Sequence, residues 1–154
     1  MKTQDFINEK IGEAEASINY LQNRVKNLKE KRMSGDSIEN WIDFEFESSS
    51  GLTKEFAQFA RDFKKYIKRF ANDTDIKYQL INFDRGHFHC SGFIKNRITQ
   101  KFAYFSISDV RFFPNEWFDH ILVRTAKNET DYTGGSNTYC RLDQLNKSVD
   151  QLTH

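Results

Sequence analysis

Residues 76–113, IKYQLINFDRGHFHCSGFIKNRITQKFAYFSISDVRFF, decide the fold of this chain. The stretch is rich in Phe, Tyr, Ile and Thr and is divided by short polar breaks, which is typical of antiparallel strands joined by tight turns. We place strands near 76–83, 87–95 and 100–107, with turns at Asp84-Arg85-Gly86 and Lys95-Asn96-Arg97. The sequence therefore predicts an antiparallel meander at the centre of an α+β domain.

The segment before the meander, 53–70, has the period of a helix with one apolar side. Its apolar residues fall within about 100° of helical arc; they are Phe56, Phe59, Ala60, Phe63, Ile67 and Phe70. The opposite arc carries Lys54, Arg61, Lys64, Lys65, Lys68 and Arg69. We expect the apolar arc to pack on the sheet and the cations to form a basic surface.

Strict alternation marks the segment Trp41–Glu47. Ile42, Phe44 and Phe46 fall on one face, and Asp43, Glu45 and Glu47 fall on the other. This pattern predicts a half-buried strand with an acidic outer face.

The first 34 residues carry a heptad pattern. Apolar residues recur at alternating spacings of 4 and 3, at Ile7, Ile11, Ala14, Ile18, Leu21, Val25 and Leu28. This pattern predicts a long, coiled-coil-like helix over 1–34, followed by the α+β domain over 37–154. Its narrow apolar stripe needs a partner helix, which is either the helix 53–70 or a second copy. In the second case Ile11, Ile18, Leu21, Val25 and Leu28 are the dimerisation residues.

Beyond the meander the pattern weakens. Pro114 interrupts the aromatic run, and we place a strand at about 119–126 and a turn-rich loop at 127–138. Leu142, Leu145, Val149 and Leu152 then predict a short final helix.

Composition excludes some classes of protein. The 154 residues have a net charge of +1 from 23 basic and 22 acidic side chains, which argues against binding to a polyanion or an anionic membrane through bulk charge. No apolar run approaches the roughly 20 residues of a membrane span. Two cysteines, Cys90 and Cys140, suit a reducing compartment, so we expect a cytoplasmic protein.

His87-Phe88-His89 is the best metal candidate. On a strand the two imidazoles would project from one face about 7 Å apart. A hydrolytic zinc site needs a third protein ligand, for which His120, Asp84, Asp43 or Glu45 would have to lie close. The alternative interpretation places both histidines on a solvated strand face.

Motifs for other chemistry are missing from the sequence, which contains no GxSxG, P-loop or GxGxxG pattern. Thr133-Gly134-Gly135-Ser136-Asn137 would suit either an anion nest or an ordinary turn. We therefore expect a protein that is not an enzyme and that holds no cofactor.

Two binding functions remain. A nucleic acid would meet phosphate-neutralising cations on the helix 53–70 and alternating aromatic residues at Lys101–Phe105. A protein partner would meet separate apolar, acidic and basic surfaces, which favour specific association. We predict a non-catalytic protein-binding module, with nucleic-acid binding as the alternative and a metal-dependent hydrolase using His87 and His89 as a further alternative.

The stretch from His87 to Leu142, above all Phe105–Phe113 and Asp131–Asn137, resembles a family of small uncharacterised proteins of bacterial phages and mobile elements. The resemblance implies an accessory protein that acts stoichiometrically, for example by blocking a host defence nuclease. It carries no catalytic motif, so no functional residue is transferred from it.

Overall fold

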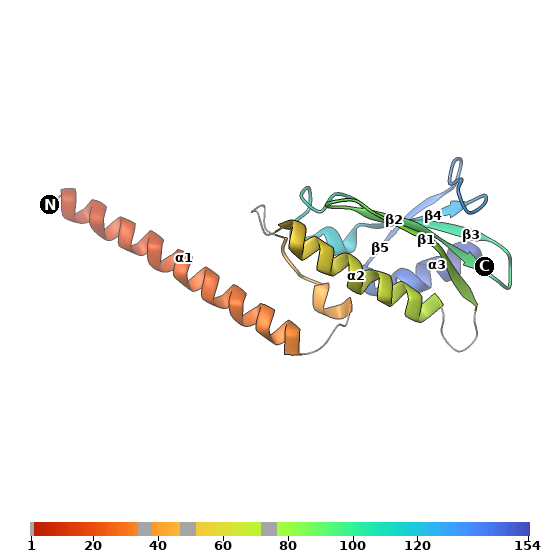
Figure 1. Ribbon diagram of the computed structural model, residues 1–154. Coiled ribbons are helices and arrows are strands. Elements are labelled where there is room, and N and C mark those ends of the chain that lie inside the picture. The colour runs from red at the N-terminus through yellow and green to blue at the C-terminus, as the bar shows by residue number, and fades with distance from the viewer. Residues whose placement is uncertain (1, 34–37, 47–51, 72–76) are drawn as a thin grey trace. The chain divides into compact units, whose positions relative to one another are not determined.

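The computed structural model confirms the α+β class and describes residues 2–33, 38–46, 52–71 and 77–154. Side chains are described for these residues except 27–33, 52–53 and 71. The chain divides into two compact units, Met1–Asp36 and Ser37–His154. The first unit is the helix α1, Lys2–Met33, as the heptad pattern predicts (Figure 1).

The second unit contains a five-stranded antiparallel sheet in the order β1-β2-β3-β4-β5. The strands are β1 (Tyr78–Arg85), β2 (Cys90–Asn96), β3 (Phe102–Ile107), β4 (Ile121–Ala126) and β5 (Asn137–Cys140). Each strand pairs with its neighbour in sequence, which confirms the meander. A bulge between Leu80 and Asn82 shifts the register of β1 against β2.

Two helices, α2 (Leu52–Ala71) and α3 (Leu145–Thr153), cover one side of this sheet (Figure 1). Three short 3-10 helices lie beside them: η1 (Ile38–Trp41), η2 (Trp117–Asp119) and η3 (Leu142–Gln144). The predicted helix 53–70 is confirmed as α2, because its apolar arc has the sheet to pack against. Phe56, Phe59, Phe63 and Ile67 are fully buried.

An aromatic cluster fills one end of this core. Phe59 lies at its centre, with its ring centroid 4.6 Å from that of Trp117 and 5.3 Å from that of Trp41. Phe46 also contacts both indole rings. The cluster therefore joins the segment 38–46, α2 and η2.

The strand predicted over 41–47 is wrong. Residues 38–41 form η1, and 42–46 form a turn and an irregular segment, in which Asp43 has a positive φ of 63°. Phe44 and Phe46 are buried, as the alternation indicated, but neither residue belongs to a strand. Their main chain bonds instead to the Trp117 indole and to the carbonyl of Pro114, at 3.0 and 2.8 Å.

The C-terminal third contains one strand that the sequence pattern did not predict. The loop assigned to 127–138 ends earlier, because Asn137–Cys140 pairs with β4 as the edge strand β5. This strand is only 4 residues long, too short for an alternating pattern to distinguish it from a loop. The predicted strand near 119–126 and the final helix are confirmed as β4 and α3.

Candidate functional site

The exposed side of α2 is a basic surface. Each of the cations predicted from the sequence is exposed; they are Lys54, Arg61, Lys64, Lys65, Lys68 and Arg69. They occupy the arc opposite the buried phenylalanines, because burial of one arc of a 3.6-residue helix leaves the other in water. Lys64 also lies over the ring of Phe83, with Nζ 5.7 Å from the centroid. We call these six residues the basic face of α2.

The acidic residues of α2 do not lie on this face. Asp62 is only 4% exposed, and its carboxylate accepts hydrogen bonds from the Trp41 indole and the Gln58 amide, both at 3.0 Å. Glu55 is half-buried. Because both carboxylates are withdrawn from the outer arc, the cations there dominate the local field.

The seam of α1 is a second candidate surface. Ile7, Ile11, Ile18, Leu21 and Val25 are each between 44% and 56% exposed. Apolar side chains repeated at heptad spacing along about 30 Å of helix form a stripe that a partner helix can cover. The side chain of Leu28 lies outside the described residues.

The predicted acidic face is only partly present, because residues 41–46 do not form a strand. Asp43 lies in the turn after η1, and Glu45 is exposed between the buried Phe44 and Phe46. Glu47 lies outside the described residues. Because Asp43 and Glu45 are not on a pleated strand, their common direction no longer follows from strand alternation.

His87 and His89 lie in the turn between β1 and β2, so the prediction that a strand carries them is wrong. The turn closes through a 2.9 Å bond from the Gly86 amide to the His89 carbonyl, and the His89 ring lies against Gly86. Among the described residues, no group of three or more His, Cys, Asp or Glu side chains could hold a metal ion. His120 stacks on Phe113 at 4.8 Å.

The aromatic pattern at Lys101–Phe105 is divided between the two sides of the sheet. Ala103 and Phe105 are buried, and Phe105 contacts Phe63 of α2. Tyr104 lies on the opposite side, where Tyr132 from the β4–β5 loop stacks on it at 4.2 Å. The aromatic rings and the basic face of α2 therefore lie on opposite sides of the sheet and cannot contact one short strand of nucleic acid together.

Two amides of the candidate anion nest, those of Thr133 and Ser136, donate to other groups of the protein. The Asp131 carboxylate accepts from the amide and the hydroxyl of Thr133 at 2.9 and 2.6 Å, and these bonds lower the Asp131 pKa. The Ser136 amide donates to the Thr125 hydroxyl at 2.9 Å. The loop 131–137 thus has the hydrogen bonds of an ordinary turn.

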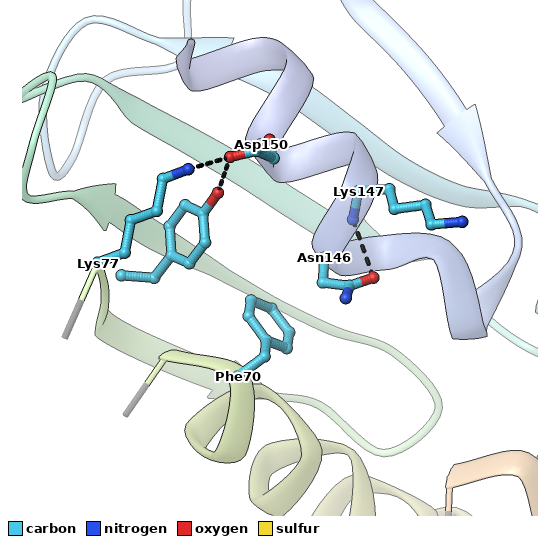
Figure 2. Close-up of a pocket in the computed structure, with 6 residues that line it drawn as sticks. Phe70, Lys77, Asn146, Lys147 and Asp150 are labelled. Atoms are coloured by element: carbon cyan, nitrogen blue, oxygen red, sulfur yellow. Dashed lines mark hydrogen bonds and ion pairs between the residues drawn. The ribbon is translucent and has the colours of Figure 1, made fainter. Parts of the chain in front are cut away.

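Sequence reasoning did not find a cavity of about 320 Å³ where the end of α2, the start of β1 and α3 meet (Figure 2). Phe70, Lys77, Tyr78, Asn146, Lys147 and Asp150 line it. Asp150 accepts hydrogen bonds from the Tyr78 hydroxyl and from Lys77 Nζ, the latter at 2.5 Å. The pairs are more than 70 positions apart in the sequence, so no local pattern predicts them.

Hydrogen bonds and burial at this cavity shift two pKa values in opposite directions. The Lys77 ammonium, followed by the Tyr78 hydroxyl, lowers the Asp150 pKa. Burial, followed by the bond to Asp150, raises the Tyr78 pKa to about 12. The Asp150 contribution to stability is present above the pKa of an unfolded aspartate and is lost as the pH falls through the lowered value. The Tyr78 contribution is present below pH 10 and is lost as the pH rises towards 12.

Replacing Tyr78 with phenylalanine is therefore expected to change the alkaline stability profile. At pH 7 the variant loses one hydrogen bond and about 1 kcal/mol of free energy of unfolding. The difference between variant and wild type should narrow between pH 10 and 12, because only the wild type has this phenol to ionise on unfolding. Urea denaturation across this range measures the difference, and a constant gap would contradict the assignment.

The fold and these surfaces define an α+β unit joined to a separate helix with an apolar seam. The chain matches no protein-family model, no curated protein and no solved structure. Within α1, α2 and α3, no described stretch combines the length and the apolar character that a membrane span needs.

Proposed function

We propose that this protein is a non-catalytic protein-binding module that pairs with a second copy of itself through the seam of α1. The observation that carries the proposal is the exposure of large aliphatic side chains at heptad positions. Burying a half-exposed Ile, Leu or Val yields about 1 kcal/mol each, half of the transfer free energy of the whole side chain. A stripe of such side chains is therefore more stable when a partner helix covers it than when it is exposed to water.

The self-association is tested by light scattering after size-exclusion chromatography. The wild-type chain is expected to have the mass of two chains rather than the 18.3 kDa of one. The double variant Ile18→Glu with Leu21→Glu is expected to be monomeric, because it places charges in the apolar seam.

A matched control is Asn19→Glu with Asn23→Glu, which adds the same charge to exposed positions of the same turns outside the seam. This control is expected to remain dimeric. A monomeric wild type at about 100 μM, where a helix pair of ordinary affinity is saturated, would reject self-association.

A narrower role, as the stoichiometric inhibitor of a nuclease, rests on the resemblance of residues 87–142 alone. It belongs to the same class of non-catalytic protein binding. The surface for such a target would be distinct from the seam, since a homodimer buries the seam.

The basic face of α2 favours a second candidate function, the binding of a nucleic acid backbone. Its six cations are exposed along a single helix and are not interleaved with exposed carboxylates among the described side chains, 54–70. Phosphate contacts of this kind do not depend on base sequence and weaken steeply with salt. The neutral total charge of the chain does not prevent them, because the cations are local.

Charge reversal at Lys64, Lys65 and Lys68 is expected to weaken binding to duplex DNA at least tenfold at low salt. Three lost phosphate contacts should also reduce the slope of log Kd against log salt by about 2.7. Fluorescence anisotropy with a labelled duplex measures both quantities. The control reverses Arg85, Arg97 and Lys127, which are exposed elsewhere, and so imposes the same change in net charge. Equal losses in both variants, or a flat salt response, would exclude a site on α2.

A further inference from the structure

The heptad positions of α1 distinguish between the two orientations in which two copies can pair. We infer that α1 packs against α1 of a second copy in parallel and in register, an inference that rests on the self-association proposed above. In the heptad frame Ile11, Ile18 and Val25 occupy the a positions, and Ile7, Ala14, Leu21 and Leu28 occupy the d positions. This division of residue types between a and d carries the argument.

Packing geometry differs between a and d layers. Isoleucine or valine at a with leucine at d favours two parallel strands. Each a residue is β-branched, and leucine occurs only at d, at Leu21 and Leu28; the other two d residues are Ile7 and Ala14. In a parallel pair each a residue meets the same a residue of its partner, whereas in an antiparallel pair each a residue faces a d residue. The confinement of leucine to d favours the parallel pair.

Register follows from the number of layers. In register, the seam forms seven layers from Ile7 to Leu28. A slip of one heptad leaves five of these seven layers. Because lost apolar layers weaken a helix pair, the aligned register is the most stable.

Charges beside the seam act in the same direction. In the parallel pair the g position of one helix lies beside the following e position of the other, so Lys10 meets the partner's Glu15, and symmetry repeats this pair. Both side chains are exposed. Among the side chains described for 2–26, only the parallel orientation places an attractive pair beside the seam.

Parallel pairing has a consequence for the rest of the chain. The Met33 ends of both copies of α1 lie together, so both 37–154 units are attached at the same end of the coil. The dimer then carries two copies of every surface on that unit at one end of the coil. Two linked sites raise the effective local concentration of the second contact, which strengthens weak binding to a repetitive target.

Disulfide trapping in the full-length chain tests orientation. Ala14→Cys and Val25→Cys are made separately, both being small changes at seam positions. A parallel pair brings each introduced thiol beside the same position of the partner helix, within the Cα separation of about 4.4–6.8 Å that a disulfide requires. The two antiparallel registers that keep the most a–d layers bring position 14 beside position 25 or beside position 18, and they separate two copies of position 25 by about 16 Å or more along the helix axis.

Each variant and an equimolar mixture are oxidised with glutathione buffer, and the linked peptides are mapped by mass spectrometry. Asn19→Cys, outside the seam, and the wild-type chain are the controls. The native thiols interfere little, because Cys90 and Cys140 are buried and burial raises the pKa of each. Circular dichroism and light scattering of the reduced variants check that each folds and pairs as the wild type does.

The expected result is a 14–14 and a 25–25 link in the mixture, each forming at least about tenfold faster than the link of the Asn19→Cys control, since only seam positions meet the distance requirement. A dominant 14–25 link would overturn the parallel orientation while leaving self-association intact. A dimer in which neither seam position links would also overturn it. A reduced wild-type chain that is monomeric would overturn both the inference and the self-association beneath it.

Discussion

Replacing Phe59 with alanine is expected to lower the free energy of unfolding of the 37–154 unit by about 3–5 kcal/mol. The side chain is 0% exposed, and its ring contacts Trp41, Phe46, Phe56, Phe63 and Trp117. Truncation removes these contacts and leaves a cavity where three segments of the chain meet. Against the roughly 5–15 kcal/mol of a typical domain, this loss is large enough to populate unfolded molecules.

Tryptophan fluorescence during guanidinium unfolding measures the loss. The chain contains two tryptophans, Trp41 and Trp117, and both contact Phe59, so the signal follows this part of the core. Phe112→Ala is the matched control, because Phe112 is 76% exposed and the substitution should change the free energy of unfolding by less than about 0.5 kcal/mol. Equal unfolding midpoints for the two variants would disprove this packing of Phe59.

Replacing Gly92 with alanine is expected to cost about 2–3 kcal/mol, at the upper end of the usual penalty for overpacking. A Cβ at this position of β2 would lie 2.4 Å from the Asn82 carbonyl oxygen and 2.6 Å from Phe105 Cζ. The carbonyl belongs to the bulged part of β1 and cannot move without disturbing the pairing of β1 with β2. The Phe105 ring is fully buried and packs against the rings of Phe63 and Phe83, which limit its movement.

Gly12→Ala is the control, and it should stabilise α1, whereas Gly92→Ala should destabilise the sheet. A Cβ at Gly12 meets nothing within 4 Å, and alanine is better than glycine in a helix by about 1 kcal/mol. Gly12→Ala should therefore raise the helical signal of α1 at elevated temperature in circular dichroism. A Gly92→Ala variant as stable as the wild type would mean that β1 and β2 do not approach as closely as described.

Long amphipathic segments were predictable because their packing preference repeats over many residues. The spacing in 1–34 and 53–70 defines α1 and α2, and the aromatic stretch 76–113 defines the central strands. The exposed side of α2 was predicted from the same helical period that placed Phe59 and Phe63 in the core. The basic face of α2 was thus found from the sequence alone, whereas the arrangement of Asp62 beneath it was not.

Short segments were less predictable, since their environment decides their structure. Phe44 and Phe46 alternate with exposed residues and yet form no strand, because an indole and a loop carbonyl satisfy their main chain. His87 and His89 lie in a turn, because the strand pairing ends at Arg85 and Cys90. The Lys77–Asp150 pair connects the start of the sheet to the last helix, and only folding brings these residues together.

The sequence by itself determined the class of fold, the two amphipathic helices and the heptad seam, because hydrophobic periodicity is a local property that every turn of helix or pair of strand residues repeats. The tertiary structure alone decided the edge strand β5, the separation of the aromatic rings from the basic face of α2, the turn that carries His87 and His89, and the cavity around Asp150. These features depend on contacts between residues far apart in the chain. Such contacts stabilise the protein only once the sheet has formed and α2 and α3 have packed against it.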